Sequence, residues 1–112
     1  WQHIAFTYNH TTNQAKLFRN GQFLAQGTFT YTSPRNASSN ILAGSSNTHT
    51  TQGFDGAIDN VRLWNIARTE AEILADFEVC LNGDETGLIA YYDFENVTEN
   101  SIPNIVGANN TG

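Results

Sequence analysis

Residues 54–64, Phe-Asp-Gly-Ala-Ile-Asp-Asn-Val-Arg-Leu-Trp, form the longest stretch of the chain with strand character, and a short helical pattern follows them. Apolar Phe54 and Ile58 share one parity, whereas Val61 and Leu63 share the other. Because side chains alternate between the faces of a strand, one inserted residue is needed to keep both pairs on one face. The intervening Asp-Asn dipeptide tolerates such backbone cheaply. We therefore predict a bent strand with a central β-bulge, buried at both ends, in the middle of a sheet.

Other strands are predicted on both sides of this stretch. Asn20-Gly21 lies between two apolar runs and is the strongest short hairpin signal in the chain, because a type I′ turn needs positive φ at both central positions. Five further strands are predicted, over residues 1–8, 15–19, 22–31, 41–44 and 87–94. The segments between them are rich in Asn, Ser, Thr and Gly, which is typical of turns and loops.

One short helix is predicted between the last two strands. Residues 69–72, Thr-Glu-Ala-Glu, have the spacing of a capping box. Ile73, Leu74 and Phe77 give the helix an apolar stripe, so we expect it to pack on the sheet. The order of elements predicts an all-β fold, an antiparallel β-sandwich in which residues 1–112 form a single domain.

Composition excludes several classes of partner. Five Lys and Arg face eleven Asp and Glu, which argues against nucleic acid and anionic membranes as ligands. No apolar run reaches the ~20 residues needed to span a bilayer. Cys80 is the single cysteine, and we interpret it as a half-buried free thiol; a disulfide to another segment is the alternative.

The blocks Trp1–Tyr8, Leu17–Gly21 and Phe54–Asn65 resemble successive blocks of the laminin-G-like family, as do Arg68–Ile73 and Glu85–Phe94. More closely, the chain is similar to the pentraxin-related branch of the concanavalin A-like lectin/glucanase superfamily. The resemblance implies a jelly roll and a place in a secreted or cell-surface multidomain protein. The chain departs from the family at Asn60, where these domains often carry Glu.

The resemblance also implies strands that precede the Trp-x-His block of residues 1–3. A complete jelly roll of this type has about twelve or more strands in two sheets, and six are predicted here. We therefore expect the C-terminal part of such a domain. Either the chain is a fragment or another polypeptide supplies the missing strands, since a six-stranded piece would expose sheet edges and invite association.

Calcium is the cofactor that the resemblance implies, bound at the rim of the sandwich through carboxylate and carbonyl oxygens. Asp55, Asp59 and Asp93 are the candidate metal ligands. Asp59 could equally cap its own backbone.

Hydrolases of the superfamily use acidic residues that alternate along one strand. The acidic pairs of this chain are Asp55/Asp59, Asp84/Glu85 and Asp93/Glu95. Asp93 and Glu95 would share one face of a strand, as a catalytic carboxylate pair requires, but Glu95 falls where the strand ends and no third acid joins them. We predict that the chain is not an enzyme.

Aromatic and histidine side chains give weak signals. Trp1 and Trp64 lie in strand patterns that point inward, which favours core packing over sugar stacking. Tyr91 and Tyr92 must face opposite sides of their strand. His3 is interpreted as a structural hydrogen-bonding residue. The remaining weak candidates are Tyr31 as a stacking platform, and His10 and His49 as solvated loop residues.

These observations predict a non-catalytic extracellular recognition or adhesion module. Its ligand would be a glycan or an extracellular protein, presented to the polar loops 9–13, 33–40 and 45–53. The alternative is a structural subunit, a homo-oligomer or repeat whose edges a neighbour completes by strand addition. A glycan hydrolase is the third hypothesis.

Overall fold

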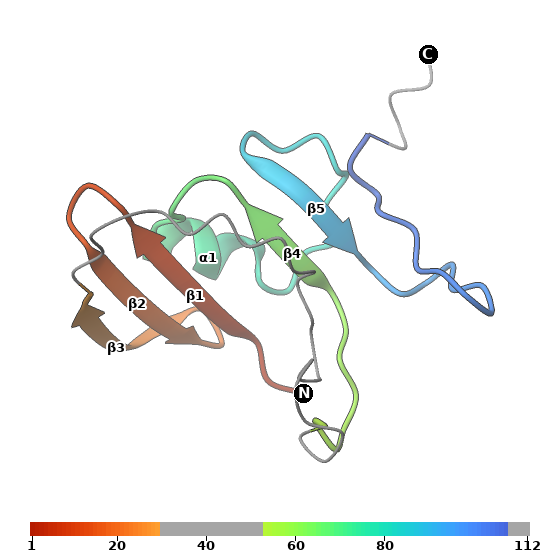
Figure 1. The fold of residues 1–112 in the computed structure, drawn as a ribbon, viewed down its shortest axis with the longest axis horizontal. Helices are drawn as coiled ribbons and strands as arrows, with labels where there is room; N and C mark the ends of the chain where they lie inside the picture. The colour runs from red at the N-terminus through yellow and green to blue at the C-terminus, as the bar shows by residue number, and fades with distance from the viewer. Residues whose placement is uncertain (30–52, 108–112) are drawn as a thin grey trace.

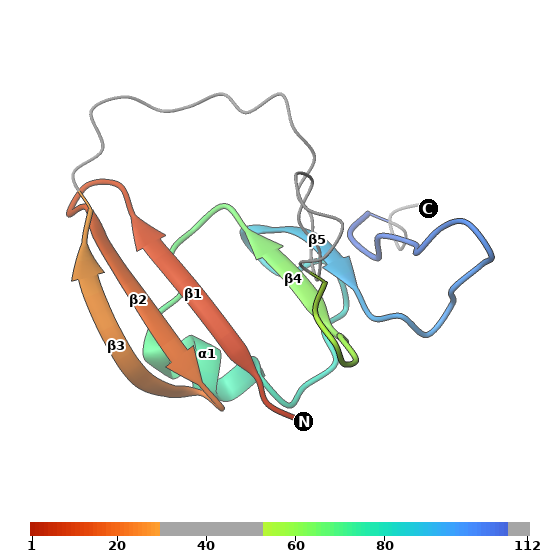
Figure 2. The ribbon, with the colours of Figure 1, turned by 60° about the horizontal axis from the view of Figure 1, so that its bottom comes forward.

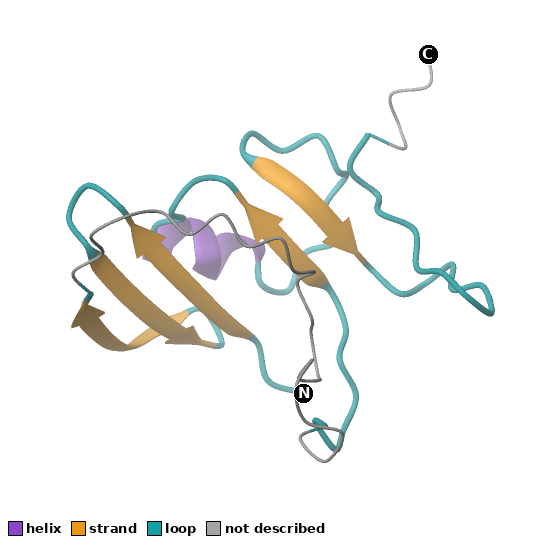
Figure 3. Cartoon of the chain, viewed as in Figure 1, coloured by secondary structure: helices purple, strands orange, loops and turns teal. Residues whose placement is uncertain are grey.

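Strands dominate the secondary structure of this chain (Figure 3). The computed structural model describes residues 1–29 and 53–107. In these residues the elements are β1 (Ile4–Asn9), β2 (Gln14–Arg19), β3 (Gln22–Thr28), β4 (Val61–Trp64), α1 (Glu70–Asp76) and β5 (Leu88–Tyr92). The predicted strand over residues 41–44 lies outside the described residues.

The strands β1, β2 and β3 form an antiparallel sheet in that order. The β1–β2 register runs from Ile4 opposite Arg19 to Asn9 opposite Gln14. The turn between β2 and β3 is Asn20-Gly21, with φ of 51° and 76°, so the predicted hairpin is confirmed. Asn and Gly adopt this left-handed backbone at the lowest cost, which is why the chain reverses here.

A second antiparallel sheet contains β4 and β5. Leu63 lies opposite Ala90, and Trp64 lies opposite Leu88, so Ile89 is an extra residue that bulges out of the ladder. Leu88, Ala90 and Tyr91 are buried, whereas Ile89 at the bulge is exposed.

The predicted strand over residues 54–64 is too long. Only its C-terminal part, β4, pairs with a neighbour, and both Phe54 and Ile58 are exposed instead of buried. Asn60 has a φ of 54°, so the backbone does turn where the sequence predicted an irregularity, but this turn precedes the strand instead of interrupting it. Without a pairing partner among the described residues, an apolar parity pattern does not become a strand.

Helix α1 begins with the predicted capping box. Glu72 N donates to Thr69 Oγ1 (3.3 Å), and Thr69 N donates to Glu72 Oε2 (2.8 Å). Ile73 is buried, whereas Leu74 of the predicted apolar stripe is half exposed.

Each end of α1 is tied to a different sheet. At its start, Phe23 N of β3 donates to Glu70 Oε1 (2.9 Å). Beyond its end, Arg62 of β4 donates to the main-chain oxygens of Asp76 (2.7 Å) and Val79. The helix therefore bridges the two sheets.

The five strands lie in one row, in the order β3, β2, β1, β4, β5, and α1 lies on one side of this row (Figures 1 and 2). The buried apolar side chains are Ala15, Phe18, Ile73, Leu88, Ala90 and Tyr91. This antiparallel arrangement of strands with one short helix confirms the predicted all-β fold class.

Candidate functional site

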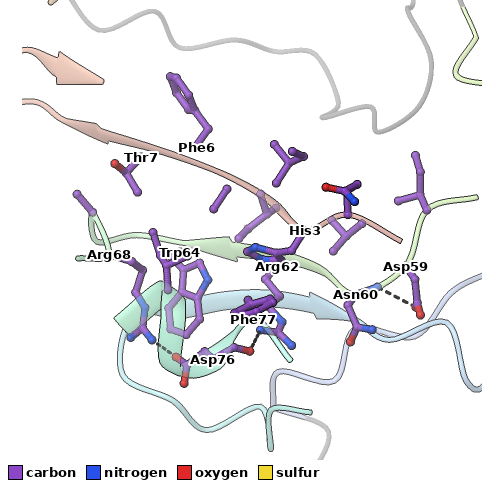
Figure 4. Close-up of a pocket in the computed structure, with 18 of the residues that line it drawn as sticks. His3, Phe6, Thr7, Asp59, Asn60, Arg62, Trp64, Arg68, Asp76 and Phe77 are labelled. Atoms are coloured by element: carbon purple, nitrogen blue, oxygen red, sulfur yellow. Dashed lines mark hydrogen bonds and ion pairs between the residues drawn. The ribbon is translucent and has the colours of Figure 1, made fainter. Parts of the chain in front are cut away.

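A groove of about 660 Å³ lies between β1 and β4. Residues 1–8 form one wall, residues 57–68 form the other, and Ile73, Asp76 and Phe77 of the helical segment line its base. We call this hollow the β1–β4 groove (Figure 4).

Large apolar side chains in the groove are exposed to solvent. Trp1 is 87% exposed, Ile4 58% and Phe6 67% on one wall. Phe54, Ile58 and Ile66 are exposed on the other side. The prediction that Trp1 packs in the core is therefore wrong, because Trp1 precedes the paired residues of β1 and no described segment covers it. Trp64 is half-buried.

Arg62 is the central cation of the groove. Its guanidinium donates to carbonyl oxygens at the C-terminal end of α1, which a helix end favours because its last carbonyls lack partners. The guanidinium also lies over the ring of Tyr91, 5.2 Å from its centroid. Arg62 Nε is buried and has no partner among the described residues.

His3 lies beside Arg62 at the base of the groove. Its ring centroid is 5.6 Å from that of Phe77, and its Nδ1 is buried without a partner among the described residues. Burial, and secondarily the charge of Arg62, lower the pKa of His3, so the ring is neutral at physiological pH. Its backbone N–H donates to Asn20 Oδ1 (2.9 Å), which ties the start of β1 to the hairpin turn.

A second cation covers Trp64. The Arg68 guanidinium lies 4.1 Å from the centroid of the indole ring. It is held there by ion pairs with Asp76 and, at 3.7 Å, with Glu72. Trp64 is therefore packed under an arginine. Figure 4 shows Arg68, Trp64 and Asp76 stacked at one end and Asp59 and Asn60 at the other.

The comparisons with known proteins identify the family. A laminin-G-type family model, described as the concanavalin A-like lectin/glucanases superfamily, matches residues 1–74, which include both walls of the groove. The chain belongs to this superfamily. Searches of curated proteins and of solved structures found no significant match. Laminin-G-type domains typically act outside the cell as non-catalytic binding modules, although the superfamily also includes hydrolases. In the described part of the chain, no helix is long and apolar enough to cross a membrane.

Two of the three predicted metal ligands flank the sheet of β4 and β5. Asp59 precedes β4 and Asp93 follows β5, and the Val61–Tyr92 pairing places both at the same end of the ladder. Asp59 Oδ1 accepts from Asn60 N (2.8 Å), and Asp93 Oδ1 accepts from Glu95 N (3.1 Å). Asp55 is exposed four residues before Asp59. Among residues 1–29 and 53–107, no group of three or more acidic, His or Cys side chains is arranged to hold a metal ion.

The acidic pair that the superfamily's hydrolases suggest does not lie on a strand. β5 ends at Tyr92, so Asp93 and Glu95 form a local turn instead of alternating along one face. Glu85 organises its own loop, because its carboxylate accepts from Asn82 N (2.7 Å) and Gly83 N (2.9 Å). Burial would raise the pKa of Glu85, but these hydrogen bonds outweigh it and lower the pKa.

The remaining candidates are placed as follows. Tyr91 is buried and Tyr92 is half-buried, as their adjacency requires. His10 is exposed, as predicted. Cys80 is an exposed free thiol instead of a half-buried one, because the segment after α1 runs along the surface. The predictions for Tyr31, His49 and loop 33–40 lie outside the described residues, as do residues 45–52 of the predicted loop 45–53.

Arg62 and Arg68 were not singled out by the sequence. The spacing from Arg68 to Glu72 is a recognisable i,i+4 pair, so that contact could have been anticipated. The contacts of Arg62 with the end of α1 join residues 14 and 17 positions apart, and no local pattern indicates them.

Proposed function

We propose that this chain is a non-catalytic recognition or adhesion module of a larger secreted or cell-surface protein, and that it binds a glycan or an extracellular protein. The observation that carries the proposal is the β1–β4 groove, where Trp1, Ile4 and Phe6 expose most of their apolar surface. Contiguous exposed apolar surface with a polar rim is typical of an interaction site. Aromatic side chains there suit both sugar rings and protein side chains.

The loop of residues 9–13 supports presentation by a rigid scaffold. Asn9 Oδ1 accepts from Thr11 N (2.9 Å) and Thr12 N (3.2 Å). The hydroxyl of Tyr8 donates to Asn13 Oδ1 (3.0 Å). A loop held in one conformation loses less entropy on binding.

A glycan array and a panel of immobilised extracellular matrix proteins, each with and without calcium, test this proposal. Trp1→Ala should weaken binding of any ligand found by about tenfold, because it removes the most exposed aromatic side chain of the groove. Leu24→Ala is the matched control, since Leu24 is exposed on β3 and does not line the groove. Equal losses in both variants, or the absence of any ligand, would count against the proposal.

Calcium binding by Asp55, Asp59 and Asp93 is a further part of the proposal. Six to eight oxygen ligands are typical, so main-chain carbonyls and water would have to complete the site. Titration calorimetry should show a heat of calcium binding that disappears in Asp59→Asn/Asp93→Asn and persists in Asp84→Asn. Identical isotherms for all three proteins would exclude these ligands.

The non-catalytic part of the proposal has its own test. The chain should release no sugar from a panel of β-glucans. Release that disappears in the double variant Asp93→Asn/Glu95→Gln would restore the hydrolase hypothesis.

The second candidate function is a structural subunit whose sheet a neighbour completes. Among the described residues, one edge of β1 and one edge of β4 have no paired strand, which favours it. Obligate oligomers in size-exclusion chromatography would support this candidate, and a monodisperse monomer would count against it.

A further inference from the structure

The chain beyond β5 returns to the side of that strand that does not pair with β4. In Figures 1 and 2 it makes a wide loop after β5 and comes back beside the strand. The return contact is made by residues 103–106, Pro-Asn-Ile-Val, and we call them the edge strap. Asn104 is exposed, whereas Ile105 and Val106 are half-buried, so the edge strap lies at the surface.

The edge strap holds both main-chain groups of Tyr91. Ile105 N donates to Tyr91 O, and Tyr91 N donates to Asn104 Oδ1, both at 2.9 Å. In an antiparallel ladder the N–H and the C=O of one residue point to the same side of the strand. Those of Tyr91 therefore point away from β4, to the place where a further strand would bond to β5. The edge strap occupies this place.

Asn104 closes the edge without adding a strand. Its side-chain oxygen accepts from Tyr91 N and also from Val106 N (3.1 Å), in the role that a main-chain carbonyl has in a ladder. A side-chain amide satisfies one edge N–H but does not continue the ladder along the chain. Pro103, the residue before it, has no N–H with which to pair. The second sheet therefore ends at the edge strap.

A loop on the other side packs against the edge strap. The Glu85 carboxylate accepts from the main-chain N–H groups of Asn82 and Gly83, which fixes this loop. A Cβ at Gly83 would lie only 2.8 Å from Ile105 O. The main chain of Ile105 therefore lies between β5 and the loop, and the edge strap is held from both sides.

The sequence of β5 explains why its edge needs cover. The strand reads Leu-Ile-Ala-Tyr-Tyr and contains no charged residue, proline or glycine. Segments of this composition pair readily with copies of themselves. Two copies of β5 related by a twofold axis would be antiparallel, and the two Tyr91 residues would exchange both of their main-chain hydrogen bonds. The edge strap and a second copy therefore compete for the same two groups.

We propose that the edge strap prevents β5 from pairing with β5 of a second copy of this chain, and that displacement of Asn104 opens β5 to this pairing. The proposal goes beyond the binding function, because β5 lies at the end of the strand row and away from the β1–β4 groove. It makes the edge strap an autoinhibitory contact that keeps one end of the module from associating.

Asn104→Ala tests the proposal, because it removes the acceptor of the Tyr91 amide. At low protein concentration, hydrogen exchange of this amide should be faster than in the parent chain by at least about tenfold. At high concentration the exchange should slow again and sedimentation velocity should show a dimer, because a second copy replaces the edge strap. Asn96→Ala, the same substitution at an exposed position before the edge strap, should behave as the parent chain does. Unchanged protection of the β2 amides verifies that each variant is folded.

A double variant tests where the copies meet. Ile89 is exposed on β5, and a lysine on an edge strand discourages pairing. Asn104→Ala/Ile89→Lys should therefore stay monomeric at the concentrations at which Asn104→Ala forms a dimer. Its Tyr91 amide should exchange rapidly at all concentrations, since neither the edge strap nor a second copy protects it.

Three results would overturn the proposal. A Tyr91 amide that exchanges equally slowly in Asn104→Ala and the parent chain would show that the edge strap does not depend on Asn104. Rapid exchange without association at any concentration would show that the opened edge does not pair. Association that survives Ile89→Lys, or that Asn96→Ala shows equally, would assign the contact to another surface.

Discussion

The hydroxyl of Tyr91 donates a hydrogen bond of 2.7 Å to Oδ1 of Asn60, across 31 residues of sequence. Tyr91 is only 1% exposed and belongs to β5, whereas Asn60 turns the chain into β4 with a φ of 54°. This hydrogen bond holds the residue that directly precedes β4. It therefore positions the start of the groove wall that β4 forms.

Removal of the Tyr91 hydroxyl should show how much this hydrogen bond contributes to the free energy of unfolding. Tyr91→Phe leaves Asn60 Oδ1 without its donor, and we expect the free energy of unfolding to fall by about 1–2 kcal/mol. Urea denaturation measures it. Asn60→Gly and Asn60→Ala both remove the acceptor, but only alanine resists positive φ, so Asn60→Ala should be less stable by a further ~1 kcal/mol. Equal stabilities would show that the backbone there relaxes.

The hairpin turn packs against the helix, and Gly21→Ala tests that packing. A Cβ at Gly21 would lie 2.7 Å from Leu74 Cδ1 and 3.0 Å from Leu74 Cα, in addition to the cost of its positive φ. We expect a loss of about 2–3 kcal/mol in the free energy of unfolding. Gly107→Ala is the control for backbone strain alone, since Gly107 has a φ of 79° and open space around it; it should lose about 1 kcal/mol. A smaller loss for Gly21→Ala than for the control would contradict close packing.

The capping box gives a prediction on helix stability. Thr69→Ala removes the hydroxyl that accepts from Glu72 N, and unfolding should become easier by about 1 kcal/mol. Thr69→Ser keeps the acceptor and should remain within a few tenths of a kcal/mol of the parent chain. Thermal unfolding followed by circular dichroism compares the three proteins. No difference between Ala and Ser would mean that packing alone holds α1.

His3 should make stability depend on pH. Its pKa is lowered in the folded chain, first by burial and then by Arg62, so the unfolded chain binds a proton at higher pH than the folded chain does. Stability is therefore fully present above about pH 6.5 and is lost as the pH falls through the folded-state pKa. Urea denaturation between pH 8 and pH 5 should show this decline in the parent chain.

Separate replacement of His3 and His10 tests whether His3 causes the loss of stability at low pH. His3→Gln should flatten the decline below pH 6.5, whereas His10→Gln, at an exposed loop position, should leave it unchanged. A decline that survives in His3→Gln would assign the effect to other groups.

Local chemistry explains which parts of the fold the sequence predicted. The Asn20-Gly21 turn depends on two residues that accept positive φ, and the box at Thr69 depends on a hydroxyl three residues before a carboxylate. Each of these two signals involves residues only a few positions apart in the sequence, so the sequence alone predicts both the turn and the capping box. The strands beside them followed from alternation alone, with their ends displaced by a few residues.

Long-range relations account for the misses. The apolar pattern of Phe54 and Ile58 predicts a buried strand only if a neighbour pairs with it, and no described segment does. Trp1 lies before the first paired residue of β1 and is exposed. In the candidate site, Asp59 and Asp93 do come to one end of a ladder, because β4 and β5 pair. The contacts of Arg62 and the groove itself depend on how the two sheets meet, which no local spacing encodes.

The bridge made by α1 has a mechanical consequence. Phe23 and Arg62 form hydrogen bonds with opposite ends of α1, a helix of seven residues. The length of the helix therefore sets the distance between the two sheets. These contacts of α1 thus set the separation of β1 and β4. Insertion of one further helical turn into α1 would move the two sheets apart by about 5 Å. The β1–β4 groove would then be wide enough for a larger ligand.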